Sequence, residues 1–437
     1  MRLIIIFSVM ASGAAAQDLP RALSDADFHP VNRLEAELGQ LLFYDPILSG
    51  NRDVSCATCH HPAFGTSDGL SLGLGDGGTG LGPDRVADPA NMPEQRIPRN
   101  SPALFNLGAR EFTVLFHDGR IEVDANRPGG LRTPLADDMV TGFASLLSAQ
   151  TMFPVLSGDE MAGHYSENDV SQAVRRGMIT GQGGAWDIIS RRVADIPAYA
   201  DRFIAVYDHI DDSAQIGFTD ISNAVAAFME LEWRSDNAPF DAVLRGAADL
   251  PEPAATGMAL FYGDAGCGTC HAGPFLTDHR FHAMGVPQIG PGKGERFESH
   301  ASDLGRFRVT GDAADMFAFR TPSLRNIALT GPYGHSGAYA DLRDFVTAHL
   351  DPVAALDSYD LDQALLPALP VDDTRGFADS AGIAAAVAVD PVLLDDGALD
   401  ALLAFLDTLT DPQVKTGVLG IPDSVPSGLS VARVPQD

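Results

Sequence analysis

Lysine is nearly absent from this sequence, which contains only Lys293 and Lys415 among its 437 residues. Acidic residues outnumber basic ones by 59 to 29, so the formal net charge is −30. Nucleic acid and anionic membrane surfaces repel a chain of this charge, and neither is expected as a partner. A basic protein, in contrast, would be attracted to it.

Long apolar runs are absent as well, because no segment approaches the roughly 18 apolar residues that indicate a membrane-spanning helix. The first residues, MRLIIIFSVMASGAAAQ, combine a basic start, a short apolar run and small residues up to Ala16. This is the pattern of a cleaved secretory signal peptide. We therefore predict that residues 1–17 are removed and that the mature protein is soluble and exported, to the periplasm in a Gram-negative host.

Cysteine is scarce too, and all four cysteines lie in two copies of one pattern, CATCH and CGTCH. A disulfide framework, a four-thiolate zinc site or a thioredoxin-like redox pair could use such cysteines, but none needs a histidine directly after each pair. Covalent haem does, because two thiols form thioethers with the porphyrin and the adjacent imidazole binds the iron. We predict two haem c groups, held by Cys56 and Cys59 with iron ligand His60, and by Cys267 and Cys270 with iron ligand His271.

The two motifs lie in an internal repeat. AELGQLLFYDPILSGNRDVSCATCH is echoed by AATGMALFYGDAGCGTCH, and each copy runs from an amphipathic segment through a glycine-containing turn to the haem motif. Helical periodicity recurs between the copies and again from about Asp395 to Thr410. The repeat predicts a mainly α fold of two cytochrome c-like helical domains, residues 18–245 and 246–437, each with one covalent c-type haem. A linker is expected at 245–257, and the Gly-, Pro- and Ser-rich tail should wrap the surface or be poorly ordered.

Several motifs resemble the bacterial di-haem cytochrome c peroxidases and the related MauG proteins. The matching segments are LGQLLFYDPILSGNRDVSCATCHHPAFGTSDG, RNSPALFN, FHDGR, DEMAG and FRTPSLRNIALTGPYGHSGAYADL. The resemblance implies a peroxidase that reduces hydrogen peroxide at the N-terminal haem with electrons delivered through the C-terminal haem. The electron donor would be a small cytochrome c or copper protein, and a homodimer is compatible with the family.

The resemblance also implies roles for residues around the first haem. DEMAG matches the catalytic segment of the family, so Glu160 is the expected acid–base residue; a carboxylate with no role beyond starting a helix is the alternative. An insertion, RPGGLRTPLADDMVTGFASLLSAQTMFPVL, precedes it. In the peroxidases a histidine of the glycine-rich loop can close the distal face of the iron, and here that position holds Asp76. We therefore expect an iron that is five-coordinate or water-bound at rest.

For the second haem, the family spacing beyond LTGPYGH points to His349 as distal ligand, with Met316, Met284 and His335 as alternatives. A His271 and His349 pair would give a lower potential than histidine with methionine. The family usually carries a tryptophan between the haems, and this chain has His117 at that position. The resemblance therefore implies that His117 is a catalytic residue that bridges the haems by hydrogen bonding, although an imidazole is oxidised less readily than an indole.

A calcium ion is also implied by the resemblance, held by the Asn100 side chain and the carbonyls of Thr330 and Pro332, since calcium prefers oxygen ligands. Two other functions remain open. One is a MauG-like oxidase that acts on a partner protein, and the other is a di-haem electron carrier without catalysis.

Overall fold

The structure is a computed structural model that describes residues 19–294, 298, 300–370, 373 and 379–434. The predicted signal peptide, residues 1–17, lies outside the described residues. Within the described part, no helix is both long enough and apolar enough to cross a membrane.

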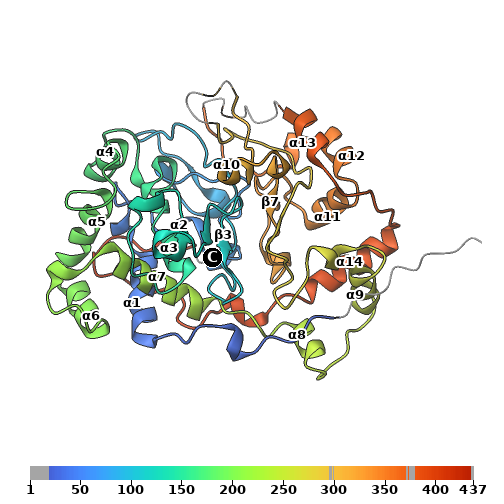
Figure 1. Cartoon of the computed structure of the whole chain (residues 1–437), viewed down its shortest axis with the longest axis horizontal. Coiled ribbons are helices and arrows are strands. Elements are labelled where there is room, and N and C mark those ends of the chain that lie inside the picture. The colour runs from blue at the N-terminus through green and yellow to red at the C-terminus, as the bar shows by residue number, and fades with distance from the viewer. Residues whose placement is uncertain (1–18, 295–297, 299, 371–372, 374–378, 435–437) are drawn as a thin grey trace, which may run out of the picture.

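The described chain is mainly helical with a few short strands, as the sequence predicts (Figure 1). The helices are α1 (Arg33–Tyr44), α2 (Cys56–Cys59), α3 (Leu146–Thr151), α4 (Asp169–Arg175), α5 (Ala185–Ala194), α6 (Pro197–Val206), α7 (Phe218–Glu232), α8 (Pro239–Leu244), α9 (Ala254–Tyr262), α10 (Phe307–Thr310), α11 (Leu342–Leu350), α12 (Pro352–Asp357), α13 (Ser380–Ala386) and α14 (Asp396–Asp407). Three small antiparallel sheets pair β1 (Gly78–Thr79) with β2 (Val86–Ala87), β4 (Ile121–Val123) with both β3 (Val114–Leu115) and β5 (Leu131–Arg132), and β6 (Phe281–His282) with β7 (Phe319–Arg320).

The first half of the chain is built on the crossing of α1 and α7. Gly39 of α1 lies directly on the backbone of α7, because a Cβ added there would be 1.8 Å from the carbonyl oxygen of Ala224. One turn further along each helix, the rings of Phe43 and Phe228 pack with centroids 5.3 Å apart. A glycine is therefore required where the two helices touch.

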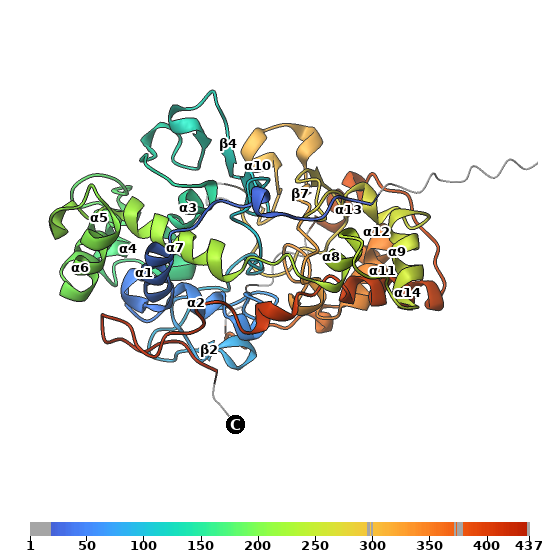
Figure 2. The ribbon, with the colours of Figure 1, turned by 90° about the horizontal axis from the view of Figure 1, so that it is seen from below.

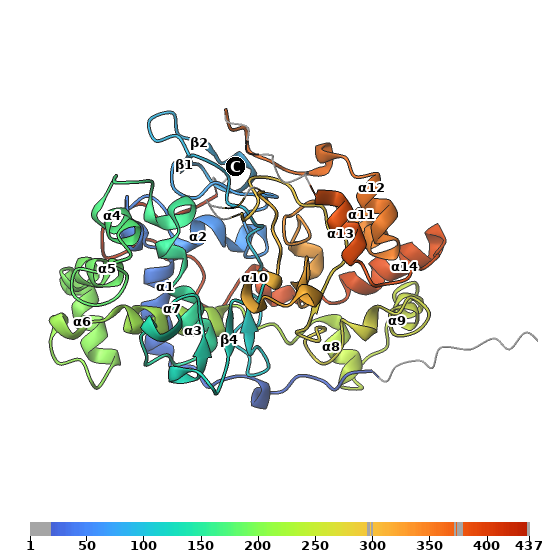
Figure 3. The same ribbon diagram turned by 45° about the horizontal axis from the view of Figure 1, so that its top comes forward.

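The second half repeats this crossing with α9 and α14, on the opposite side of the molecule (Figure 3). A Cβ at Gly257 of α9 would lie 1.8 Å from the carbonyl oxygen of Ala401. Phe261 and Phe405, again one turn along each helix, have ring centroids 5.1 Å apart. The repeat in the sequence is thus a repeat of structure, in which glycine and the phenylalanine four residues later form the same contact.

The described tail returns to the first half of the molecule. The buried carboxylate of Glu232, at the end of α7, accepts hydrogen bonds from the backbone N–H groups of Val418, Leu419 and Gly420 at 2.9, 2.6 and 2.9 Å. Gln40 of α1 donates to two carbonyls of the same segment. Figure 2 shows this red C-terminal segment running along the half that contains α1 and α7. The division of the chain at residue 245 stays a prediction.

The insertion also packs on the first half. Its first part forms β5, which pairs with β4 through Glu122 and Arg132. Its later part forms α3, which contacts α7, where Thr151 Oγ1 and Ser222 Oγ lie 2.8 Å apart. The insertion therefore extends the core around α7.

Candidate functional site

The first haem motif forms the single helical turn α2. Ser55 precedes it in an extended conformation, and its backbone N–H donates to Thr58 Oγ1 at 3.0 Å. The turn closes with a hydrogen bond from His60 N to Cys56 O at 2.9 Å. Because residues three apart lie on one side of a helical turn, Cys56 and Cys59 face the same way.

All four cysteines are free thiols, so neither pair forms a disulfide. Burial raises the pKa of the Cys56 and Cys59 thiols to about 12, whereas a redox-active pair needs a thiolate at neutral pH. Within the described residues, no metal-ligand cluster joins cysteines of the two motifs, which argues against a four-thiolate zinc site.

Both motif histidines have their Nδ1 atoms fixed by backbone carbonyls. His60 Nδ1 lies 3.0 Å from Thr66 O and 3.2 Å from Ser101 Oγ, and His271 Nδ1 lies 3.2 Å from Leu276 O. An Nδ1–H that donates to a carbonyl leaves Nε2 as the ligand atom and orients the ring. Paired free thiols followed by an imidazole with a free Nε2 fit a haem c at each motif.

His349 faces the second motif from α11. Its Nδ1 donates to the carbonyl of Phe345 at 2.9 Å, which again leaves Nε2 available. Burial lowers the pKa of His271 to about 4, and the electrostatic effect of His349 lowers this pKa further. The alternative ligand His335 stacks its ring on Phe319 with centroids 3.6 Å apart and lies within electrostatic range of Asp303 and Arg99.

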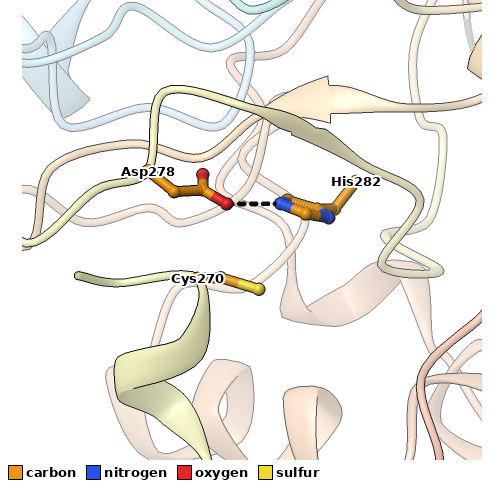
Figure 4. Close-up of side chains that lie close together, drawn as sticks. All are labelled: Cys270, Asp278 and His282. Atoms are coloured by element: carbon orange, nitrogen blue, oxygen red, sulfur yellow. Dashed lines mark hydrogen bonds and ion pairs between the residues drawn. The ribbon is translucent and has the colours of Figure 1, made fainter. Parts of the chain in front are cut away.

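Two side chains that the sequence analysis did not single out lie beside the second motif. His282 Nε2 and Asp278 Oδ2 are 2.8 Å apart, and Cys270 lies next to them, so that the three ligand atoms fall within 4.8 Å of one another (Figure 4). A thioether at Cys270 would remove its thiolate from any metal site here. Their four-residue spacing, Asp-x-x-x-His, is the only signal of this pair in the sequence.

Glu160 lies in a π-helical turn, Gly158–Ala162. The carbonyl of Ser157 accepts hydrogen bonds from the N–H groups of residues 160, 161 and 162, which holds the turn closed. Burial raises the pKa of the Glu160 carboxyl, and the positive charges of Arg120 and Lys293 partly oppose this increase. A carboxyl that can keep a proton at higher pH than an exposed glutamate suits acid–base chemistry.

The glycine-rich loop that contains Asp76 packs against this turn. The backbone N–H of Asp76 donates to the carbonyl of Glu160 at 2.9 Å. The structure therefore brings together the loop and the DEMAG segment, although the insertion separates them further in the sequence. Lys293, one of only two lysines in the chain, lies near enough to Glu160 to affect its pKa.

His117 lies in a network of buried charges between the two halves. Its Nε2 is 3.2 Å from the carbonyl oxygen of Asn100, and burial, with Arg99 and His335 nearby, lowers its pKa to about 3. Arg99 forms ion pairs at 2.7 Å with both Asp118 of the first half and Asp303 of the second. His117 is thus neutral and rigidly placed.

The three predicted calcium ligands come from two segments. The Asn100 side chain donates through Nδ2 to the carbonyl of Leu70 at 2.9 Å, and this orients its amide. The carbonyl of His335, in the loop that follows Pro332, accepts a hydrogen bond from the backbone N–H of Asn100 at 2.9 Å. Coordination of calcium by Asn100, Thr330 and Pro332 stays a prediction.

Comparison with known proteins gives consistent relatives. A family model described as di-haem cytochrome c peroxidase matches residues 33–249. The chain is 29% identical over 326 residues to the methylamine utilization protein MauG of Methylorubrum extorquens, covering 74% of this chain and 70% of that protein. It is 30% identical over 329 residues to the cytochrome-c peroxidase IdrP2 of Pseudomonas sp. strain SCT, covering 71% of each. A solved MauG-like protein associated with microbial copper homeostasis aligns over 93% of this chain and 97% of its own, with 26% identity and a TM-score of 0.57.

Proposed function

Since the chain belongs to the di-haem cytochrome c peroxidase family and is an oxidoreductase of that type, we propose that it reduces hydrogen peroxide at the N-terminal haem motif. The electrons arrive through the C-terminal motif from a small cytochrome c or copper protein. Peroxide, two electrons and two protons give two molecules of water. The observation that supports this proposal most directly is the raised pKa of Glu160 in a turn held beside the Asp76 loop.

A haem attached at Cys56 and Cys59 would supply an iron that binds peroxide and exchanges electrons. His60 would hold that iron through Nε2, and the carbonyl of Thr66 keeps the ring of His60 in place through Nδ1. The Glu160 carboxylate takes a proton from one peroxide oxygen and returns it to the other, which then departs as water. The neighbouring cations Arg120 and Lys293 stabilise the carboxylate while the proton is in transit.

The second motif serves electron entry. His271 and His349 would hold a haem from both faces, and a bis-imidazole site favours electron transfer because it leaves no position for peroxide. His117 lies between the halves and holds neighbouring backbone in place: its ring bonds the Asn100 carbonyl and its own carbonyl accepts the N–H of Arg320 at 2.8 Å. We assign it a structural part in the contact between the two haem sites.

The proposal includes features that support the same activity. The protein would act in the periplasm after removal of residues 1–17. A calcium ion held by Asn100, Thr330 and Pro332 would stabilise the contact between the two domains, 18–245 and 246–437. The excess of acidic residues favours a basic electron donor, and a homodimer would match the family.

A MauG-like oxidase that acts on a partner protein is the second candidate. The aspartate at position 76, where the peroxidases carry a distal histidine, favours it, because an open iron needs no prior reduction to react with peroxide. The two candidates differ in the final reductant: a peroxidase oxidises a small electron-transfer protein in each turnover, whereas an oxidase leaves a permanent modification in its partner.

The test is peroxide-dependent oxidation of a reduced small cytochrome c by Glu160→Gln. We expect kcat to fall about 100-fold, within the range for loss of a general acid–base residue, while absorption spectra still show both haems. Glu94→Gln is the matched control, because Glu94 is an exposed glutamate in the same region, and it should retain wild-type kcat. Undiminished turnover in Glu160→Gln would show that another group moves the proton.

A further inference from the structure

Asp76 is a fully buried carboxylate whose presence the chemistry assigned above does not explain. Its side chain has no exposed surface, and aspartates are seldom buried so completely unless they have a specific role. We propose that Asp76 is a positioning residue of the peroxide reaction, which holds the backbone of Glu160 in place and so determines where the Glu160 carboxyl can reach. The inference rests on the proposed function of Glu160.

The backbone around Asp76 lies directly on the turn that carries Glu160. Besides the hydrogen bond from Asp76 N–H to Glu160 O, the preceding Gly75 leaves no space between the two segments. A Cβ added at Gly75 would be 2.3 Å from the carbonyl oxygen of Asp159 and 2.4 Å from that of Glu160. Any movement of the loop therefore moves the turn.

The carboxylate of Asp76 then anchors the loop to three other segments. Its Oδ1 accepts a hydrogen bond from Asn51 Nδ2 at 2.9 Å, and its Oδ2 accepts one from Asn91 Nδ2 at 3.3 Å. His164 Nε2 lies 3.9 Å from Oδ2. His164 follows Glu160 by four residues, so Asp76 contacts the catalytic turn through its backbone and faces the residue just beyond the turn with its side chain.

Independent contacts show that this region is built to be rigid. Arg85 donates from Nη2 to the carbonyl of Gly75 at 2.6 Å and from Nη1 to that of Gly80 at 2.8 Å, which holds the loop from its other side. His164 Nε2 is buried and has no hydrogen-bond partner among the described residues, and Asp76 Oδ2 lies 3.9 Å from it. Because Arg85 holds the loop at Gly75 and the two asparagines hold it at Asp76, the Asp76 N–H that donates to the Glu160 carbonyl is fixed in position.

The charge state of Asp76 matters to this arrangement. Burial raises its pKa to about 6, with further increases from Asp53 and Glu167 and opposing effects of Asn51 and His164; the guanidinium of Arg85 is also within electrostatic range. Above this pH the carboxylate can accept from both asparagines. Below it, one oxygen carries a proton, so the hydrogen bonds from Asn51 and Asn91 that position the loop weaken as pH falls through about 6, even though the cost of burying the charge is relieved.

The raised pKa of Asp76 also means that its ionised carboxylate makes folding less favourable. An aspartate with a folded pKa of about 6 opposes folding above its ordinary pKa of 3.8, and the penalty is complete above pH 6. Replacement by neutral asparagine should therefore leave stability at pH 7 unchanged or increased. A merely structural residue would behave in the opposite way, since its loss would reduce stability.

The test compares Asp76→Asn with Asp53→Asn in the full-length protein carrying both haems. Asp53 contributes charge to the same cluster but is exposed, and no hydrogen bond joins its described side chain to the Glu160 turn. For Asp76→Asn we expect kcat to fall about 10- to 100-fold, the usual effect of losing a residue that orients a reacting group, with the KM for peroxide within about twofold of wild type. The wild-type protein should lose activity as pH falls through about 6, and Asp76→Asn should not show this decrease. Hydrogen–deuterium exchange of residues 158–164 should become faster in Asp76→Asn. Asp53→Asn should match the wild type in kcat, KM and exchange, and its pH profile should shift only to lower pH, because the charge of Asp53 contributes to the raised pKa of Asp76.

Unchanged exchange of residues 158–164 in Asp76→Asn would overturn the proposal, whatever happens to kcat. A wild-type kcat and pH profile in this variant would overturn it as well. If the wild-type protein does not consume peroxide, the proposed function fails on that result alone, and the exchange measurement still decides whether Asp76 holds the turn.

Discussion

The crossing of α9 and α14 allows a quantitative test of how the second half is held together. Gly257→Ala would place a methyl group 1.8 Å from the carbonyl oxygen of Ala401 and 2.9 Å from Phe405 Cβ. Since Cβ contacts shorter than 3.0 Å are essentially never seen, the helices would have to separate by about 1.2 Å. Both contacts involve helix backbone or a Cβ, so no rotamer change can relieve them.

The magnitude follows from two opposing effects. Overpacking of a core costs about 1 to 3 kcal/mol and sometimes more, and here the packing of Phe261 on Phe405 is lost as well. Alanine in a helix recovers about 1 kcal/mol relative to glycine. We therefore expect a net loss of about 2 kcal/mol. Gly397→Ala in the same α14 is the control. Its new Cβ would lie at an ordinary 3.4 Å from Asp395 Oδ1, so the substitution should be neutral or slightly stabilising.

The assay is urea unfolding followed by the absorption of each haem, which separates the two halves. Gly257→Ala should lower the urea midpoint of the second haem while the first is less affected, and Gly39→Ala should do the reverse because it occupies the equivalent position against Ala224. A Gly257→Ala protein as stable as wild type would refute the reasoning that only glycine fits where these helices touch.

Two further predictions concern contacts described above. His349→Ala should convert the second iron from low-spin to high-spin, because it removes the imidazole that faces His271, and an unchanged electron paramagnetic resonance spectrum would mean that another residue is the ligand. Glu232→Gln should release the tail, because an amide replaces the carboxylate that accepts three backbone N–H groups. A loss of about 2 kcal/mol corresponds to about 30-fold faster hydrogen exchange of residues 414–432. Exchange at the wild-type rate in these residues would contradict this prediction.

Local patterns in the sequence predicted the parts of the protein that depend on local chemistry. CATCH and CGTCH identify paired thiols and imidazoles, and in the structure Nδ1 of each imidazole lies beside a backbone carbonyl; attachment of haem at these residues stays a prediction. The repeat predicted two matching helical units, and Gly39 and Gly257 occupy equivalent contacts. The final helix was expected from about Asp395 to Thr410, and α14 spans Asp396–Asp407. The linker expected at 245–257 overlaps the start of α9 at Ala254.

The remaining features depend on contacts between distant segments. Nothing near Glu232 in the sequence indicates that it binds the backbone of Val418 to Gly420, because that contact spans almost half the chain. Asp278 and His282 become notable only when folding places them beside Cys270. Asp76 could be recognised as the residue at the family's histidine position, but its bonds to Asn51 and Asn91 required the structure.

The electron paramagnetic resonance spectrum of the fully oxidised protein, before and after one equivalent of hydrogen peroxide, tests the central claim most directly. The account predicts a high-spin ferric signal from the iron at His60 beside a low-spin bis-imidazole signal from the iron at His271 and His349, and loss of the high-spin signal once peroxide is added. Two low-spin signals that peroxide leaves unchanged would contradict it, because neither iron would then be open to react.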